Sequence, residues 1–303
     1  MPQPILIDTD AGDDIDDVLA IAFALLRPEL EVRAITTVSP GSRQRAGLIK
    51  RLLAATGHPD IPVAAGMELP LRLVSPQELA HITDLKRVLN HAGPDVTGTD
   101  FILAPRDGVS QIIQTVEEAN GDLGIVGIGP LTNIACALRR RPEIAGQIRW
   151  IALMGGEVDL PRAEHNINWD YQAAAIVLNS GIPIFLGTWS VTRQFVLMPP
   201  DLELIAECDL ELTRFLSPLI QLWWPYRGAK PGPVMYDIAP IMWAFAPEYY
   251  PAELMSLAVE TRGELTRGTT VRVSGDPNVQ VSRSMDAEGV RRLYLDTILG
   301  GRS

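Results

Sequence analysis

The chain has little cysteine and no long hydrophobic run. Only two of its 303 residues are cysteines, Cys136 and Cys208, and they lack CxxC spacing, which argues against a disulfide framework. No stretch reaches the roughly 18 consecutive apolar residues that a membrane-spanning helix needs. Residues 1–4 lack the basic start of a signal peptide. We therefore expect a cytoplasmic protein with reduced thiols and no membrane partner.

Positive charge is also scarce, since the chain has 37 acidic and 26 basic residues and its formal net charge is −11. Such an excess of acid disfavours binding to phosphate backbones, so we expect no nucleic-acid partner. Apolar residues make up 47% of the chain, and the mean hydropathy is +0.11, which is typical of folded globular proteins. Without a repeat or a Pro/Gly-rich linker, the sequence predicts one domain over residues 1–303.

Short apolar runs alternate with segments of helical periodicity. The runs are continuous rather than alternating, which predicts strands buried on both faces, as in a parallel sheet between helical layers. They occupy residues 4–8, 32–38, 61–65, 123–128, 148–154 and 182–186, and the helical segments include 17–26, 45–56, 108–120, 131–140 and 286–299. The pattern predicts an α/β fold with a doubly wound, mostly parallel sheet and a Rossmann-like core, followed by a hairpin near residues 264–273.

Six aspartates fall within ten residues directly after the first apolar run, at positions 8, 10, 13, 14, 16 and 17. The carboxyl end of a strand is where ligands bind in open α/β sheets. Two unit charges about 4 Å apart near a surface repel by roughly 4 kcal/mol, whereas a helix N-terminus returns about 0.3–1 kcal/mol per acid. Some of these carboxylates must therefore extend into water, be protonated or share a cation, and such hard ligands favour Ca²⁺ or Mg²⁺.

Several of these polar residues could have simpler roles than metal binding. Asp13, Asp14 and Asp16 are equally well suited to cap and solvate a helix start. Asp170 is more typical of a helix N-cap, and His165 of an exposed loop residue. A Mg²⁺-dependent phosphatase with Asp8 as nucleophile would also need a lysine near the phosphate. The chain has only three lysines, at positions 50, 86 and 230, and none follows a strand in a suitable context.

Further motifs follow the aspartate-rich segment in a fixed order: Ala-Ile-Thr-Thr-Val at 34–38, Ile-Pro-Val-Ala-Ala-Gly at 61–66, Gly-Pro-Leu-Thr-Asn-Ile-Ala at 129–135, Ala-Leu-Met-Gly-Gly at 152–156, Ala-Glu-His-Asn-Ile-Asn-Trp-Asp at 163–170 and Tyr-Asp-Ile-Ala-Pro at 236–240. Each motif alone has low specificity. Together with the aspartates, their order and spacing resemble the inosine-uridine preferring nucleoside hydrolase family over nearly the whole chain.

The resemblance implies Ca²⁺-dependent hydrolysis of the N-glycosidic bond of ribonucleosides, which gives ribose and a free purine or pyrimidine base for salvage. It implies that Asp10 binds the metal and acts as the general base, with Asp17, Asp237 and the backbone carbonyl of Ile128 as further ligands. It also implies that Asp16, Met154, Glu164 and Asn166 contact the ribose, with Tyr236 beside the substrate, and that the protein is a homodimer or homotetramer.

The sequence departs from the family pattern at several positions. Two extra residues follow Gly12, so the family's aspartate pair is placed on Asp16–Asp17, with Asp13–Asp14 as the competing placement. Ser39 and Ser42 stand where an Asn or Asp is usual, and no Asn precedes Glu164. Tyr236 replaces the family's histidine, and a phenol with a pKa near 10 is a slow acid at pH 7. A catalytically impaired nucleoside-binding protein is therefore the alternative to an enzyme.

An aromatic run precedes the Tyr-Asp motif by about ten residues. Its members are Trp223, Trp224 and Tyr226. They could offer a stacking face to a nucleobase, or they could form an ordinary half-buried aromatic cluster.

Overall fold

Eight strands form the central sheet of the computed structural model, which describes residues 1–84, 89, 101–226 and 228–301. All neighbouring strands run parallel except the pair at one edge, β10 and β7. This confirms the mostly parallel, doubly wound sheet. Across the sheet the order is β3 (Val63–Ala65), β2 (Leu30–Thr37), β1 (Gln3–Thr9), β4 (Leu123–Gly127), β5 (Ile148–Met154), β6 (Ile184–Gly187), β10 (Val279–Ser282) and β7 (Ala252–Met255).

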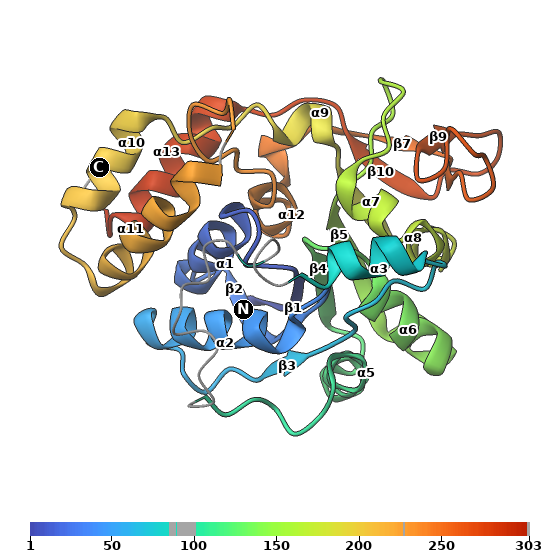
Figure 1. Cartoon of the computed structure of the whole chain (residues 1–303), viewed down its shortest axis with the longest axis horizontal. Coiled ribbons are helices and arrows are strands. Elements are labelled where there is room, and N and C mark those ends of the chain that lie inside the picture. Colours follow the sequence, from blue (N-terminus) through green and yellow to red (C-terminus); the bar gives the residue numbers. More distant parts are fainter. Residues whose placement is uncertain (85–88, 90–100, 227, 302–303) are drawn as a thin grey trace.

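Helices cover both faces of this sheet (Figure 1). Side chains of β1 alternate between the two layers: Ile5 and Ile7 belong to the core shared with α1 and α12, and Leu6 to the core shared with α5 and α6. The helices are α1 (Asp16–Leu26), α2 (Ser42–Ala55), α3 (Pro76–Ile82), α5 (Gly108–Ala119), α6 (Thr132–Arg140), α7 (His165–Trp169), α8 (Tyr171–Leu178), α9 (Trp189–Thr192), α10 (Pro199–Glu207), α11 (Glu211–Trp223), α12 (Ile238–Trp243) and α13 (Ala287–Ile298).

The predicted hairpin lies partly elsewhere. Its two strands are β8 (Leu257–Val259) and β9 (Thr270–Arg272), which pair in antiparallel fashion. Residues 264–269, predicted as part of a strand, belong to the connection between them. The chain turns there because the carboxylate of Glu260 accepts hydrogen bonds from the backbone N–H groups of Arg262 and Gly263.

The order of the strands determines where a ligand can bind. From β1 the sheet continues to β2 and β3 on one side and to β4 and β5 on the other. In doubly wound sheets the crevice for a ligand lies at such a reversal, outside the carboxyl ends of the strands. Asp8 and Asp10 at the end of β1 and Ile128 after β4 therefore lie at the expected position.

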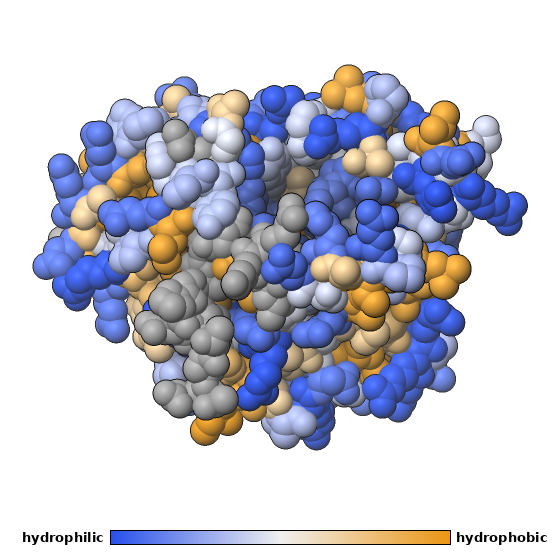
Figure 2. Space-filling view, viewed as in Figure 1, coloured by the Kyte–Doolittle hydropathy of each residue, from blue (hydrophilic) through white to orange (hydrophobic). Residues whose placement is uncertain are grey.

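One face of the molecule shows how polar and apolar side chains are distributed. On the face drawn in Figure 2, hydrophobic residues are scattered among hydrophilic ones. No helix in the described ranges is long and apolar enough to cross a membrane.

Candidate active site

A cavity of about 390 Å³ opens at the carboxyl ends of the central strands. Nearly every residue that the sequence singled out lines it. These residues are Asp10, Asp13, Asp14, Asp16, Asp17, Ile128, Met154, Glu164, His165, Asn166, Trp223, Tyr226, Tyr236 and Asp237. The sequence thus predicts most of the cavity wall, although its members lie more than 200 residues apart in the chain.

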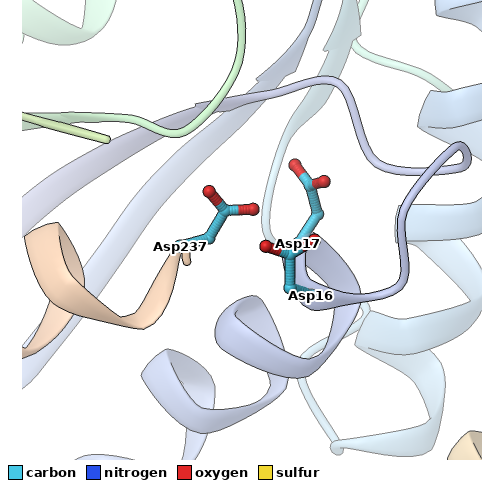
Figure 3. A group of neighbouring side chains, drawn as sticks. All are labelled: Asp16, Asp17 and Asp237. Atoms are coloured by element: carbon cyan, nitrogen blue, oxygen red, sulfur yellow. The ribbon is translucent and has the colours of Figure 1, made fainter. Parts of the chain in front are cut away.

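Three aspartates form the floor of this cavity. Asp16 and Asp17 lie in the first turn of α1, and Asp237 directly precedes α12, so that two helix starts bring the carboxylates together (Figure 3). Each offers an oxygen within 4.8 Å of the others, and all three side chains are buried. We call these residues the three-aspartate group.

The electrostatics of the three-aspartate group favour a bound cation. Burial, followed by repulsion from neighbouring carboxylates, raises the pKa of Asp16, Asp17 and Asp237 well above the ordinary value. Buried like charges at this spacing are tolerated only if they are protonated or share a positive ion. Because all the donors are carboxylate oxygens, the group suits a hard divalent cation rather than zinc.

The geometry also distinguishes between Asp16–Asp17 and Asp13–Asp14 as the positions of the family's aspartate pair. Asp13 is exposed, and the carboxylate of Asp14 accepts a hydrogen bond of 2.6 Å from the ammonium of Lys230. Neither residue belongs to the three-aspartate group. The placement on Asp16–Asp17 is therefore the one that the geometry favours.

Asp10 lies beside the three-aspartate group without belonging to it. Its half-buried side chain faces the cavity, and burial raises its pKa, while the charges of Arg45 and His165 oppose the shift. The buried guanidinium of Arg45 donates hydrogen bonds to the backbone carbonyls of Asp10, Ala11 and Pro40. A helix of the next βα unit thus fixes the loop that presents Asp10, a role of Arg45 that no local motif predicts.

The opposite wall is built around the start of α7. Glu164 is its N-cap, and the carboxylate accepts hydrogen bonds from the backbone N–H groups of Asn166, Ile167 and Gly156 at 3.0–3.1 Å. Burial raises the pKa of Glu164, and the charge of His165 and these donors oppose the shift. Capping and a role in the cavity are therefore compatible for this residue.

Asn166 connects two strand ends across the cavity. Its amide nitrogen donates to the carbonyl oxygen of Met154 at 3.1 Å and to that of Ile128 at 3.4 Å. The side chain therefore holds the carbonyl of Ile128, which the resemblance implies as a metal ligand, in the cavity that also contains the three-aspartate group.

Asp8 points away from the cavity. It is fully buried, and one carboxylate oxygen accepts hydrogen bonds from Thr36 at 2.6 Å and from Asn133 at 2.8 Å. Burial raises the pKa of Asp8 to about 7. A side chain enclosed in this way cannot reach a substrate in the cavity, so the structure gives no support to Asp8 as the nucleophile of a phosphatase.

The remaining predictions have mixed outcomes. Trp223 and Tyr226 line the cavity, but Trp224 lies in a separate groove with Leu202 and Ile220, because the chain turns into a 3₁₀-helix at that residue. The proposed stacking role of Trp224 is therefore not compatible with its position.

Four further residues from the sequence analysis can be compared with their positions in the structure: Ser39, Ser42, Asp170 and His165. Neither serine lines the cavity, and the hydroxyl of Ser42 instead bonds to the backbone of Thr37 and Gly66. Asp170 is the N-cap of α8, as predicted, and accepts a hydrogen bond from Ala173. His165 is exposed, as predicted, but it faces the cavity.

Several cavity residues escaped the sequence analysis. They are Arg162, Trp189 and Lys230, of which Arg162 lies 4.1 Å from the ring centroid of Trp189. The sequence analysis named Lys230 only as one of three lysines without a suitable context, although the rarity of lysine in this chain could have drawn attention to it. Lys50 bonds to the carbonyl of Pro59, and Lys86 lies outside the described residues.

Comparisons with known proteins identify ribonucleoside hydrolases as relatives of this chain. The pyrimidine-specific ribonucleoside hydrolase RihA of Salmonella paratyphi A is 32% identical over 315 aligned positions, which cover 98% of this chain and 99% of the relative. The non-specific ribonucleoside hydrolase RihC of Escherichia coli O1:K1 is 35% identical with the same coverage. The solved structure of the plant nucleoside hydrolase PpNRh1 superposes with a TM-score of 0.85 and 28% identity over 99% of both chains.

A family model also matches residues 5–292, which is nearly the whole chain. The match includes both helix starts that form the floor of the cavity. The protein belongs to the inosine-uridine preferring nucleoside hydrolase family.

Proposed function

We propose that the protein hydrolyses the N-glycosidic bond of ribonucleosides with Ca²⁺ as its cofactor, and that residues 1–303 act as one catalytic domain. The observation that carries the proposal is the three-aspartate group, buried at the floor of the same cavity that Glu164 and Asn166 line. Membership of the nucleoside hydrolase family supports the reaction, and the names of the relatives support a ribonucleoside as the substrate.

The oxygen donors suit Ca²⁺ better than a smaller ion. We propose Asp10, Asp17, Asp237 and the carbonyl of Ile128 as protein ligands. Together with a water and two sugar hydroxyls they reach about seven oxygens, or about eight if one carboxylate binds through both oxygens, and Ca²⁺ favours this number. When bound, the cation would lower the pKa of that water and help to hold the sugar hydroxyls.

Asp10 is the proposed general base. Its carboxylate faces the cavity next to the three-aspartate group, where it can accept a proton from the attacking water. Arg45 fixes the backbone of Asp10, so the carboxylate is held in place before the substrate arrives. The carboxylates around the sugar also stabilise the positive charge that develops on the ribose ring as the base departs.

The sugar is proposed to lie between the floor and the α7 wall. Asp16 reaches a ribose hydroxyl from the floor, while Glu164, Asn166 and Met154 contact the ring from the other side. The base then points to the wall formed by Trp223, Tyr226 and Tyr236. Because relatives of similar identity are described as pyrimidine-specific and as non-specific, both purine and pyrimidine ribonucleosides are proposed as substrates.

A substrate panel tests this function. The protein, loaded with Ca²⁺, is incubated with inosine, uridine, cytidine and adenosine, and released ribose is measured with and without a chelator. We expect release from at least one nucleoside and its loss on chelation. Binding of all four nucleosides without ribose release would instead support the impaired binding protein, and phosphate release from an aryl phosphate with Mg²⁺ would support the phosphatase.

A further inference from the structure

Lys230 is a cavity residue to which the mechanism above gives no role. It lies in the loop before α12, and its side chain is 33% exposed. Its ammonium nitrogen is 2.6 Å from a carboxylate oxygen of Asp14 and 5.5 Å from the ring centroid of Tyr236. A fixed positive charge therefore stands on the wall of a cavity whose floor is acidic.

The ion pair with Asp14 keeps this charge in place. Partial burial works against the ammonium, but the carboxylate of Asp14 outweighs it and raises the pKa of Lys230. An ammonium has three N–H donors, and Asp14 occupies one of them. The pair joins segments 216 residues apart, so the loop before α1 determines where the ammonium lies.

The position of Lys230 matches the region that a departing base must occupy. The floor and the α7 wall are the proposed sugar site. Of the cavity residues outside it, Lys230 lies beside the ring of Tyr236, and the others include Arg162, Trp189, Trp223 and Tyr226. When the C1′–N bond breaks, its electron pair stays on the base nitrogen and negative charge spreads over the ring. A preformed positive donor beside that charge lowers the barrier, because the interaction strengthens as the bond breaks.

We propose that Lys230 is a catalytic residue that donates a hydrogen bond to the departing nucleobase, with Asp14 as its positioning residue. Water adds to C1′ and gives its proton to Asp10, the C1′–N bond breaks, and the base leaves as an anion held by the ammonium and is later protonated by solvent. This inference rests on the nucleoside hydrolase activity proposed above. It assigns to Lys230 the stabilisation of the leaving group that Tyr236 would otherwise have to supply.

Two substrates with different leaving groups test the assignment. Uridine releases a base that needs stabilisation, whereas 4-nitrophenyl β-D-ribofuranoside releases a phenolate that is stable as an anion. For Lys230→Met we expect kcat/KM for uridine, or for the best nucleoside of the panel, to fall by roughly 10²-fold, the usual loss of one preorganised donor. The 4-nitrophenyl riboside should keep its rate, which also shows that the variant is folded.

Further variants complete the design. Lys230→Arg retains a positive donor and should recover part of the uridine activity. Asp14→Asn keeps the shape of its side chain but weakens the hold on the ammonium. It should therefore lower kcat/KM for uridine by less than Lys230→Met does, and it should likewise leave the rate with the 4-nitrophenyl riboside unchanged. Lys50→Met removes a lysine that bonds to Pro59 away from the cavity, and it should leave both rates unchanged.

Each contrary outcome points to a different error. Equal losses on both substrates, or no loss on either, would overturn the role of Lys230. That role is also excluded if Tyr236→Phe gives the uridine-selective loss and Lys230→Met does not. If the wild-type protein cleaves neither substrate, the proposed function itself is wrong, and the inference about Lys230 is overturned together with it.

Discussion

At the residue scale, the proposed mechanism depends most on Asp10. Removing its carboxylate takes away the proposed base, so we expect Asp10→Ala to lower kcat by a factor on the order of 10²–10⁴. The fold should persist, because the backbone of Asp10, not its side chain, makes the hydrogen bond with Arg45. Ribose release with the panel nucleosides and a thermal melting curve check both expectations.

The matched control is Asp60→Ala. Asp60 is an exposed carboxylate between α2 and β3, away from the cavity, and its removal should leave the rate unchanged. Activity of Asp10→Ala close to that of the wild type would exclude Asp10 as the base.

The residues of the site divide into those that a sequence can reveal and those that it cannot. Asp16, Asp17 and Asp237 stand in motifs whose spacing is visible in the chain. Arg45 and Lys230 have no such motif, because each lies next to a partner that only the tertiary fold brings near: Arg45 holds the backbone of Asp10, and Asp14 holds the ammonium of Lys230. Their roles follow from contacts rather than from local pattern.

At the scale of elements, α2 supports the loop between β1 and α1. The substitution Arg45→Met would leave the carbonyls of Asp10, Ala11 and Pro40 without this donor. We expect a loss of about 1–3 kcal/mol in the free energy of unfolding, the usual cost of unsatisfied buried groups, together with weaker Ca²⁺ binding. Denaturant titration and calorimetric titration with Ca²⁺ measure the two effects.

Arg43→Met is the control on the same helix, because Arg43 is exposed and its guanidinium faces the ring of Phe101. It should change neither quantity. A destabilised Arg45→Met protein with unchanged Ca²⁺ affinity would show that Arg45 supports the fold but not the metal site.

The turn after β4 limits the room around Asp10. A Cβ at Gly129 would lie 2.8 Å from both the backbone nitrogen and a carboxylate oxygen of Asp10, and 3.0 Å from a methyl group of Val38. Since backbone atoms on this turn cannot move freely, Gly129→Ala should displace the carboxylate of Asp10 and abolish most of the activity. Gly146→Ala, where nothing lies within 4 Å, should be neutral in the same ribose-release assay.

The central elements could be predicted, and the peripheral ones could not, for a physical reason. Most residues of strands β1 to β6 are buried and fall within apolar runs, although β2 includes the exposed Arg33 and β5 the exposed Arg149. In contrast, the first three residues of the edge strand β7 are exposed, and β10 alternates valine with polar residues, so neither forms such a run. The hairpin was predicted at the wrong residues because the turn after Glu260 depends on a side-chain contact, which an apolar pattern does not reveal.

At the scale of the whole molecule, the acidic excess is partly concentrated in the cavity. Burial raises the pKa of each member of the three-aspartate group, so the metal-free folded protein holds protons that the unfolded chain releases above about pH 4. The free energy of unfolding of the metal-free protein should therefore fall as the pH rises from about 4 through the raised pKa values. Each carboxylate that ionises inside the fold adds repulsion.

Calcium should reverse this trend. Because the ion competes with protons for the same oxygens, its affinity should increase with pH, and at 100 times Kd it adds about 2.7 kcal/mol to the free energy of unfolding. We therefore expect Ca²⁺ to raise Tm more at pH 7.5 than at pH 5.5, in melting curves measured with Ca²⁺ and with a chelator. Mg²⁺ at the same concentration should raise it less.

Asp237→Asn provides the decisive comparison for this prediction. It removes one carboxylate from the group, so the metal-free variant should melt above the metal-free wild type at pH 7.5, while its response to Ca²⁺ should be largely lost. A calcium shift that is equal at both pH values, or that survives in Asp237→Asn, would mean that the ion binds elsewhere. In that case the acids at the two helix starts would be stabilised by protons rather than by a metal.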